Sequence, residues 1–199
     1  MKTTIRTHKL TIMALMTAIL LIFSFTPIGT IPIGPLSVSL NVIPVAIAAI
    51  AVGPAGGAAA GAIFGILSFL QCIGIGVPSG MGVILFGINP FYAFLQRFIP
   101  RLLEGFFAGL IFKALRRKNI TFACAVTGFC TAFLNTLFFM SALILLFGST
   151  DYVQGLVGGR NLLLFVCAFV GINAVVEMIV ATIVSSAVGT ALFKAKILQ

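Results

Sequence analysis

Six apolar runs follow one another along the chain, and they constrain the fold more than any other feature. A helix needs about 20 mostly apolar residues to cross a bilayer. Only 8% of the residues are charged, whereas a soluble domain carries about 25%. The sequence therefore predicts an all-α membrane protein with one domain, residues 1–199, and six transmembrane helices. The expected spans are about 9–25, 37–52, 57–73, 90–115, 120–147 and 162–193.

Basic residues flank these runs and set the expected orientation. They lie in three clusters: Lys2, Arg6 and Lys9, then Lys113, Arg116, Arg117 and Lys118, then Lys194 and Lys196. Because cytoplasmic loops of membrane proteins are enriched in Lys and Arg, both termini and the loop at 113–118 are expected in the cytoplasm. The outward loops are then 26–36, 74–89 and 148–161. The net charge of +9 therefore reflects topology rather than nucleic-acid binding.

Several classes of function lack the residues they need. The only histidine, His8, lies in the N-terminal tail, and the four cysteines show no CxxC spacing. We therefore expect no metal site, no cofactor and no enzyme activity, and we expect the cysteines to be buried free thiols. No GxxxxGK[ST] motif for binding ATP is present either.

Small residues recur every four positions on two runs. Gly57, Gly61 and Gly65 form one such face, which lets helices approach closely in lipid. We expect this face to pack inside the bundle. Ala14 and Ala18 form another on the first run, and this pair could pack internally or meet another protein.

The fourth run carries three charges on one stripe. Arg97, Arg101 and Glu104 lie at i, i+4 and i+7 of the segment NPFYAFLQRFIPRLLEGFF. A charge at the bilayer centre costs at least ~2.5–3.5 kcal/mol, so such residues usually face the protein interior. At 1.5 Å per residue, Arg101, Asn135 and Asn173 lie at similar depths, roughly 16–18 Å from the outer ends of their helices. Glu104 and Glu177 are expected just below.

This arrangement predicts a polar pocket that opens outward. Arg97 and Asn135 are the first expected ligand contacts, followed by Asn173 and Arg101, and then by Asn89 and Asn41. Arginine and amide groups suit a carboxylate that carries further hydrogen-bonding groups. The absence of Trp and the presence of only two Tyr favour a small aliphatic acid over a large planar ligand.

Structural roles compete with this interpretation. Pro100 frees the carbonyl group of Gln96, so Arg101 could bind that carbonyl, or it could pair with Glu104 or Glu177. We expect the two glutamates to be structural counter-ions. Two arginines and two glutamates sum to zero, so a bound anion would leave excess negative charge unless one glutamate is protonated or lies outside the pocket.

Nearly the whole chain resembles the substrate-binding S component of energy-coupling factor (ECF) transporters. The resemblance rests on the basic tail, on Ala14 and Ala18, and on the segments IPIGPLSVSLNVIPVAIAAIAVGPAGGAAAG and NPFYAFLQRFIPRLLEG. FLNTLFFMSALILLFG and INAVVEMIVATIV are most similar to the pantothenate branch, with the folate branch next.

The resemblance implies a multi-pass protein of a prokaryotic plasma membrane. Such a protein binds a vitamin with high affinity on the outer side and docks through Ala14 and Ala18 on a transmembrane coupling subunit that carries two ATP-binding subunits. It also implies that residues 26–40 act as a lid. Toppling of the S component in the membrane then releases the ligand inside the cell. An S component for another vitamin and an autonomous transporter driven by protons through Glu104 or Glu177 remain alternatives.

Overall fold

The computed structural model describes residues 2–33, 36–159 and 162–197. Within these residues the chain forms eight α-helices, one 3-10 helix and one two-stranded antiparallel sheet. The elements are α1 (Lys2–Phe25), β1 (Thr30–Ile33), β2 (Leu36–Ser39), α2 (Val42–Val52), α3 (Pro54–Leu70), η1 (Gln71–Ile73), α4 (Gly80–Ile88), α5 (Pro90–Leu115), α6 (Ile120–Phe147), α7 (Asp151–Val157) and α8 (Leu162–Lys194).

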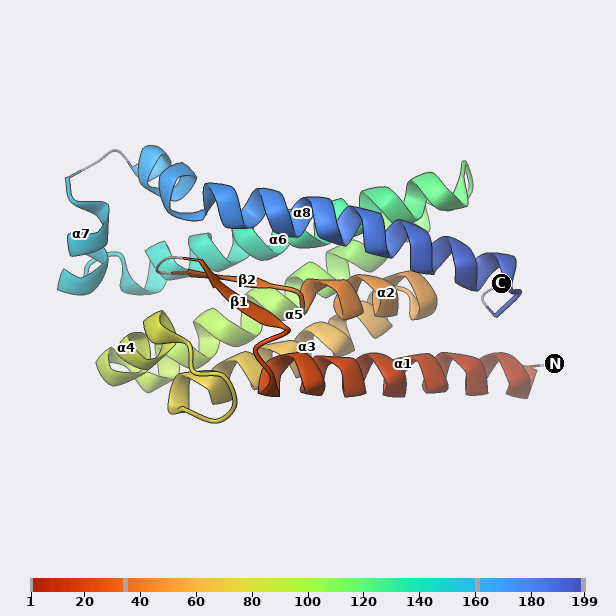
Figure 1. Cartoon of the computed structure of the whole chain (residues 1–199), viewed down its shortest axis with the longest axis horizontal. Helices are drawn as coiled ribbons and strands as arrows, with labels where there is room; N and C mark the ends of the chain where they lie inside the picture. The colour runs from red at the N-terminus through yellow and green to blue at the C-terminus, as the bar shows by residue number, and fades with distance from the viewer. Residues whose placement is uncertain (1, 34–35, 160–161, 198–199) are drawn as a thin grey trace.

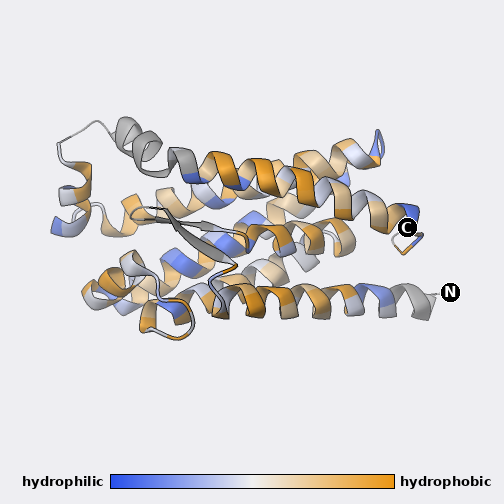
Figure 2. Cartoon of the chain, viewed as in Figure 1, coloured by the Kyte–Doolittle hydropathy of each residue, from blue (hydrophilic) through white to orange (hydrophobic). Residues whose placement is uncertain are grey.

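The long helices run along one axis of the molecule (Figure 1). Both ends of the chain and the turn between α5 and α6 lie at one end of this bundle, and α4 and α7 lie at the other. The three basic clusters therefore share one end. Figure 2 shows apolar residues over most of the long helices and hydrophilic bands on α5 inside the bundle.

Four helices are long and apolar enough to cross a membrane, judged by length and composition over the described residues. They cover Thr7–Phe25, Pro54–Ile73, Ile120–Phe147 and Asn173–Lys194. The observed bounds of α5 and α6 coincide with the predicted spans 90–115 and 120–147. α5 has the length of a span, but it carries the three charges of its buried stripe.

The predicted second span, 37–52, is wrong at its start. Residues 36–39 form β2 and pair with β1, so that Thr30 lies opposite Ser39. This pairing satisfies the backbone groups that a helix would otherwise have satisfied. The helix itself, α2, has 11 residues and reaches only ~16 Å. Its residues Val42–Ala51 are all buried, so α2 is a core helix of the bundle.

The predicted outward loops also contain structure that the sequence patterns missed. α4 occupies residues 80–88 of the predicted loop 74–89, and α7 lies within 148–161. η1 forms the last three residues of the predicted span 57–73. The sheet occupies the segment predicted as a lid. Cys72 and Cys124 are buried free thiols as expected, whereas Cys130 is only partly buried. The side chain of Cys167 lies outside the described residues.

The glycine face of α3 packs against α5, which confirms the predicted internal packing. A methyl group added at Gly57 would overlap the carbonyl oxygen of Gly105, and one added at Gly61 would overlap that of Arg101. The two helix backbones are therefore in direct contact. Since Arg101 belongs to the same α5 segment, this contact also positions the charged stripe.

We expect Gly61→Ala to lower the free energy of unfolding in detergent by roughly 1–3 kcal/mol, because the added methyl must push α3 away from α5. Gly87→Ala on α4 is the matched control, since a methyl group there meets no atom within 4 Å. Thermal unfolding of the two purified variants measures the difference. Equal melting temperatures would show that the contact between α3 and α5 does not require glycine.

Candidate ligand-binding pocket

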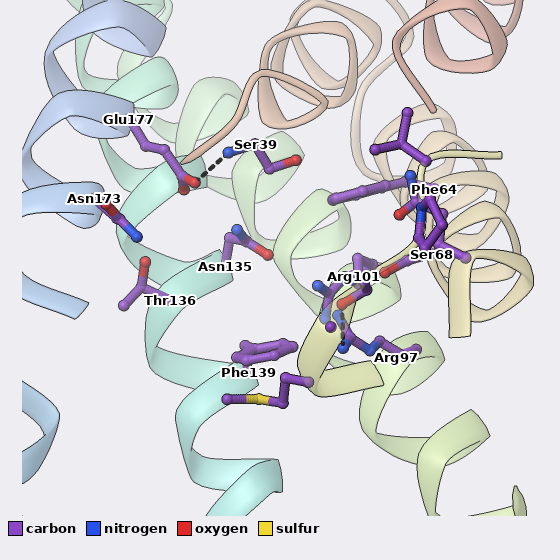
Figure 3. A pocket seen from close by; sticks show the side chains of 16 residues that line it. Ser39, Phe64, Ser68, Arg97, Arg101, Asn135, Thr136, Phe139, Asn173 and Glu177 are labelled. Atoms are coloured by element: carbon purple, nitrogen blue, oxygen red, sulfur yellow. Dashed lines mark hydrogen bonds between the residues drawn. The ribbon is translucent and has the colours of Figure 1, made fainter. Parts of the chain in front are cut away.

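A polar pocket lies between α3, α5, α6 and α8 and is closed at its sides by the end of β2 and the start of α4 (Figure 3). Most of the charged stripe and the two predicted amide side chains line it. The lining residues are Ser39, Phe64, Ser68, Gln71, Val77, Pro78, Ser79, Gly80, Met81, Arg97, Arg101, Asn135, Thr136, Phe139, Asn173 and Glu177.

Arg97 projects from α5 toward the start of α4. Its Nη2 atom donates a hydrogen bond to Ser79 Oγ over 3.1 Å. The same hydroxyl caps α4 by accepting a hydrogen bond from the backbone N–H of Gly82. The guanidinium carbon lies 5.1 Å from the centre of the Phe139 ring. Arg97 is buried, and its Nε atom has no hydrogen-bond partner.

Arg101 is held by the irregularity that Pro100 introduces into α5. Its Nη1 atom donates to the carbonyl oxygen of Gln96 at 3.5 Å, the group freed by the missing N–H of Pro100. Its guanidinium carbon lies 5.2 Å from the Phe64 ring centre and 4.6 Å from that of Phe139. This contact is one of the structural alternatives considered for Arg101, which nevertheless lines the pocket and keeps a buried Nε atom without a partner.

The opposite wall of the pocket presents acceptors. Glu177 Oε1 on α8 accepts a hydrogen bond from the backbone N–H of Ser39 over 2.6 Å, so this carboxylate ties the end of β2 to α8. Asn135 on α6 lies between Glu177 and the arginines (Figure 3), and its buried Oδ1 atom has no hydrogen-bond partner. Asn173 lies on the Glu177 side of the pocket.

The two glutamates differ in position relative to the pocket. Glu177 lines the pocket, whereas Glu104 is fully buried and is not a lining residue. Neither carboxylate oxygen of Glu104 has a hydrogen-bond partner. The lining thus carries two arginines and one glutamate, a formal charge of +1. One bound monovalent anion would bring the lining to neutrality, so the site is electrostatically suited to a carboxylate.

Two predicted ligand contacts lie elsewhere. The Asn89 side chain accepts hydrogen bonds from the backbone N–H groups of Phe91 and Tyr92, both over 3.1 Å, and so caps α5. Asn41 is buried just before α2 and donates to Ser39 Oγ over 3.4 Å. Neither residue is among those that line the pocket. Capping explains the polarity of Asn89, whereas the buried Oδ1 atom of Asn41 has no hydrogen-bond partner. Since neither residue lines the pocket, we remove both from the site.

Several lining residues were not predicted. Thr136 follows Asn135 directly, and Phe139 lies one helical turn further along α6, where periodicity could have placed it. Ser79 precedes the apolar segment of α4 and carries the signal of a helix N-cap. Gln71 donates from Nε2 to the carbonyl oxygen of Ser24 over 3.0 Å, and no sequence pattern indicates that contact between η1 and α1.

The predicted docking residues lie on the outer side of α1. Ala14 and Ala18 are exposed, whereas Ile12, Met16 and Leu20 on the other side of this helix belong to the core. Leu15 and Ile22 extend the exposed apolar surface, and each is 55% exposed. The small side chains of Ala14 and Ala18 leave the α1 backbone accessible between these larger neighbours.

Comparison with known proteins adds an independent observation. The sequence profile of the family described as "ECF transporter, substrate-specific component" matches residues 8–189. A protein described as "Pantothenate transporter PanT" from Leuconostoc mesenteroides is 33% identical over 198 residues, which cover 94% of this chain and 93% of that protein. A "Pantothenic acid transporter PanT" from Lactococcus lactis is 27% identical over 178 residues, which cover 81% of each chain.

Proposed function

Since this chain belongs to the family of substrate-specific components of ECF transporters, we propose that it binds pantothenate in the polar pocket for uptake into the cell. The chain is a membrane protein and a binding subunit of a transporter, not an enzyme. Its similarity to two proteins described as pantothenate transporters supports this ligand.

One observation carries the assignment of the ligand class. Two buried arginines line the pocket, and each keeps a buried Nε atom without a partner. Burying a charged donor is costly unless it is paired. A carboxylate bound between these guanidinium groups would compensate their buried positive charge and accept charge-assisted hydrogen bonds from them. Pantothenate has one carboxylate, one amide and two hydroxyls, which match the remaining amide and acceptor groups of the lining.

The proposed topology has six transmembrane helices with both termini in the cytoplasm. The charged α5 is the fifth of these helices, and the short α2 together with the β1–β2 hairpin before it takes the place of the remaining span. The grouping of both chain ends and the turn between α5 and α6 at one end (Figure 1) supports this orientation, because the basic clusters then face the cytoplasm. The pocket beside β2 and α4 faces the other side, where it can take up a vitamin from outside.

Partner subunits complete the proposed transporter. The chain would dock through Ala14 and Ala18 on a transmembrane coupling subunit that carries two ATP-binding subunits, and toppling would release pantothenate inside. The exposure of the two alanines on an apolar helix face supports this docking. The β1–β2 hairpin beside the pocket would act as the lid, and its backbone link to Glu177 supports that role.

We expect the detergent-purified chain to bind pantothenate with one-to-one stoichiometry in isothermal titration calorimetry without ATP or partner subunits. Folate and biotin are the comparison ligands. If the protein binds folate or biotin and not pantothenate, the proposed ligand is wrong and the proposed uptake mechanism is retained. Uptake that proceeds without the ATP-binding subunits would instead indicate an autonomous transporter and contradict the proposed function.

A further inference from the structure

We propose that Glu177 is a specificity-determining residue whose carboxylate accepts a hydrogen bond from a hydroxyl of the ligand. It thereby selects small carboxylic acids that carry a hydroxyl at the end remote from their carboxylate. The inference rests on the proposed function, because it assigns the hydroxyl-bearing end of pantothenate to the α8 side of the pocket.

The surroundings of Glu177 suit this role better than that of a structural counter-ion. The side chain is 5% exposed, and its hydrogen-bonded neighbours are the backbone N–H of Ser39 and the Asn135 side chain. Arg101, on the other side of the pocket, contacts the Gln96 carbonyl and two aromatic rings. An ionised carboxylate accepts through two oxygens and about four lone-pair directions. Glu177 therefore has room to accept a hydrogen bond from a ligand.

The two ends of the pocket have opposite charge. Arg97 and Arg101 lie on the α5 side, Glu177 lies on the α8 side, and Asn135 lies between them (Figure 3). A ligand carboxylate is attracted to the arginines and repelled by Glu177, so its orientation in the pocket is fixed. The opposite end of the ligand then meets the Glu177 carboxylate, which can accept a hydrogen bond. A hydroxyl satisfies that acceptor, whereas a methyl group leaves it unpaired in a buried site.

The same carboxylate also holds the end of β2 through Ser39, so a variant must keep this link if it is to test specificity alone. Glu177→Gln does so, because the glutamine side chain retains an oxygen that can accept from the Ser39 N–H and has nearly the same volume. It removes the negative charge and replaces one acceptor oxygen by an NH₂ group, which donates. Glu104→Gln is the matched control, since Glu104 is equally buried but does not line the pocket.

The experiment compares pantothenate with its dideoxy analogue, the N-acyl-β-alanine that has the same carbon skeleton and lacks both hydroxyls. Both are titrated into the wild-type, Glu177→Gln and Glu104→Gln proteins by calorimetry. We expect Glu177→Gln to weaken pantothenate binding by about tenfold or more, the range for a hydrogen bond to a charged group. Its affinity for the analogue should change by less than about twofold, and Glu104→Gln should leave the ratio of the two affinities unchanged.

Equal losses for both ligands in Glu177→Gln would assign Glu177 a structural role and overturn the inference alone. If the variant does not fold, the ratio of the two affinities of the wild-type protein is the test. A ratio of less than about threefold in favour of pantothenate overturns the inference, and a larger ratio supports it. Wild-type protein that does not bind pantothenate overturns the proposed function, and the inference falls with it.

Discussion

Ala18→Trp is expected to abolish pantothenate uptake into cells or vesicles that contain the complete transporter, while binding to the isolated chain stays unchanged. Ala18 is exposed on α1, and its side chain is not among those that line the pocket. A tryptophan there fills the space between the larger side chains of Leu15 and Ile22, and so prevents a partner helix from approaching the α1 backbone. Uptake of labelled pantothenate and calorimetry on the purified variant measure the two effects.

The matched control is Ala187→Trp, which makes the same substitution at an exposed alanine of α8. It adds the same bulk to a lipid-facing surface away from α1, so we expect it to retain uptake. Normal uptake by Ala18→Trp would show that this face of α1 is not the docking surface. Loss of uptake in both variants would attribute the effect to bulk on the membrane surface and not to docking.

Arg97→Ala is expected to weaken pantothenate binding by more than tenfold, which corresponds to more than about 1.4 kcal/mol. The substitution removes a charged donor from the pocket lining and also the contact with Ser79 that fixes the start of α4. A hydrogen bond to a charged group is worth about 1.5–3 kcal/mol, so the expected loss is of the size of one such bond. Calorimetry on the purified variant measures it.

Two further variants separate the causes of this loss. Ser79→Ala removes the hydroxyl that accepts from Arg97 but leaves the guanidinium in place, so it should cost less than Arg97→Ala. Arg117→Ala removes an exposed arginine of the basic cluster at 113–118 and should leave affinity unchanged. Unchanged affinity in Arg97→Ala would remove Arg97 from the site and leave Arg101 as the partner of the carboxylate.

Much of the membrane architecture follows from the sequence, because lipid imposes a simple rule on composition. A helix that crosses lipid must be apolar over its length, so apolar runs mark α1, α3, α6 and α8 directly. The rule fails for short segments. Residues 36–39 pair with β1 across a short hairpin, and their alternation of apolar and polar side chains, Leu-Ser-Val-Ser, is typical of a strand. The predicted span included residues 37–39 because they adjoin the apolar run of α2.

The residues of the pocket, too, could be predicted only in part from the sequence. Spacing along each helix predicts the depth of a residue, and Arg101, Asn135 and Asn173, predicted to lie near one level, do line one pocket together with Arg97. Depth is fixed by the constant rise of a helix and can be counted from the sequence. The serines at positions 39 and 79 could not be found in this way, since they reach the pocket from segments outside the long helices.

The sequence alone determined that the chain is a bundle of apolar helices with a buried charged stripe, and its motifs identified the family. Only the tertiary structure separated Glu177, which faces the pocket, from Glu104, which does not. Both are buried glutamates at similar predicted depths, so spacing cannot distinguish them. The physical reason is that the rotation of each helix about its own axis depends on close contacts with its neighbours, such as that between Gly57 and Gly105, and these contacts form between residues far apart in the chain.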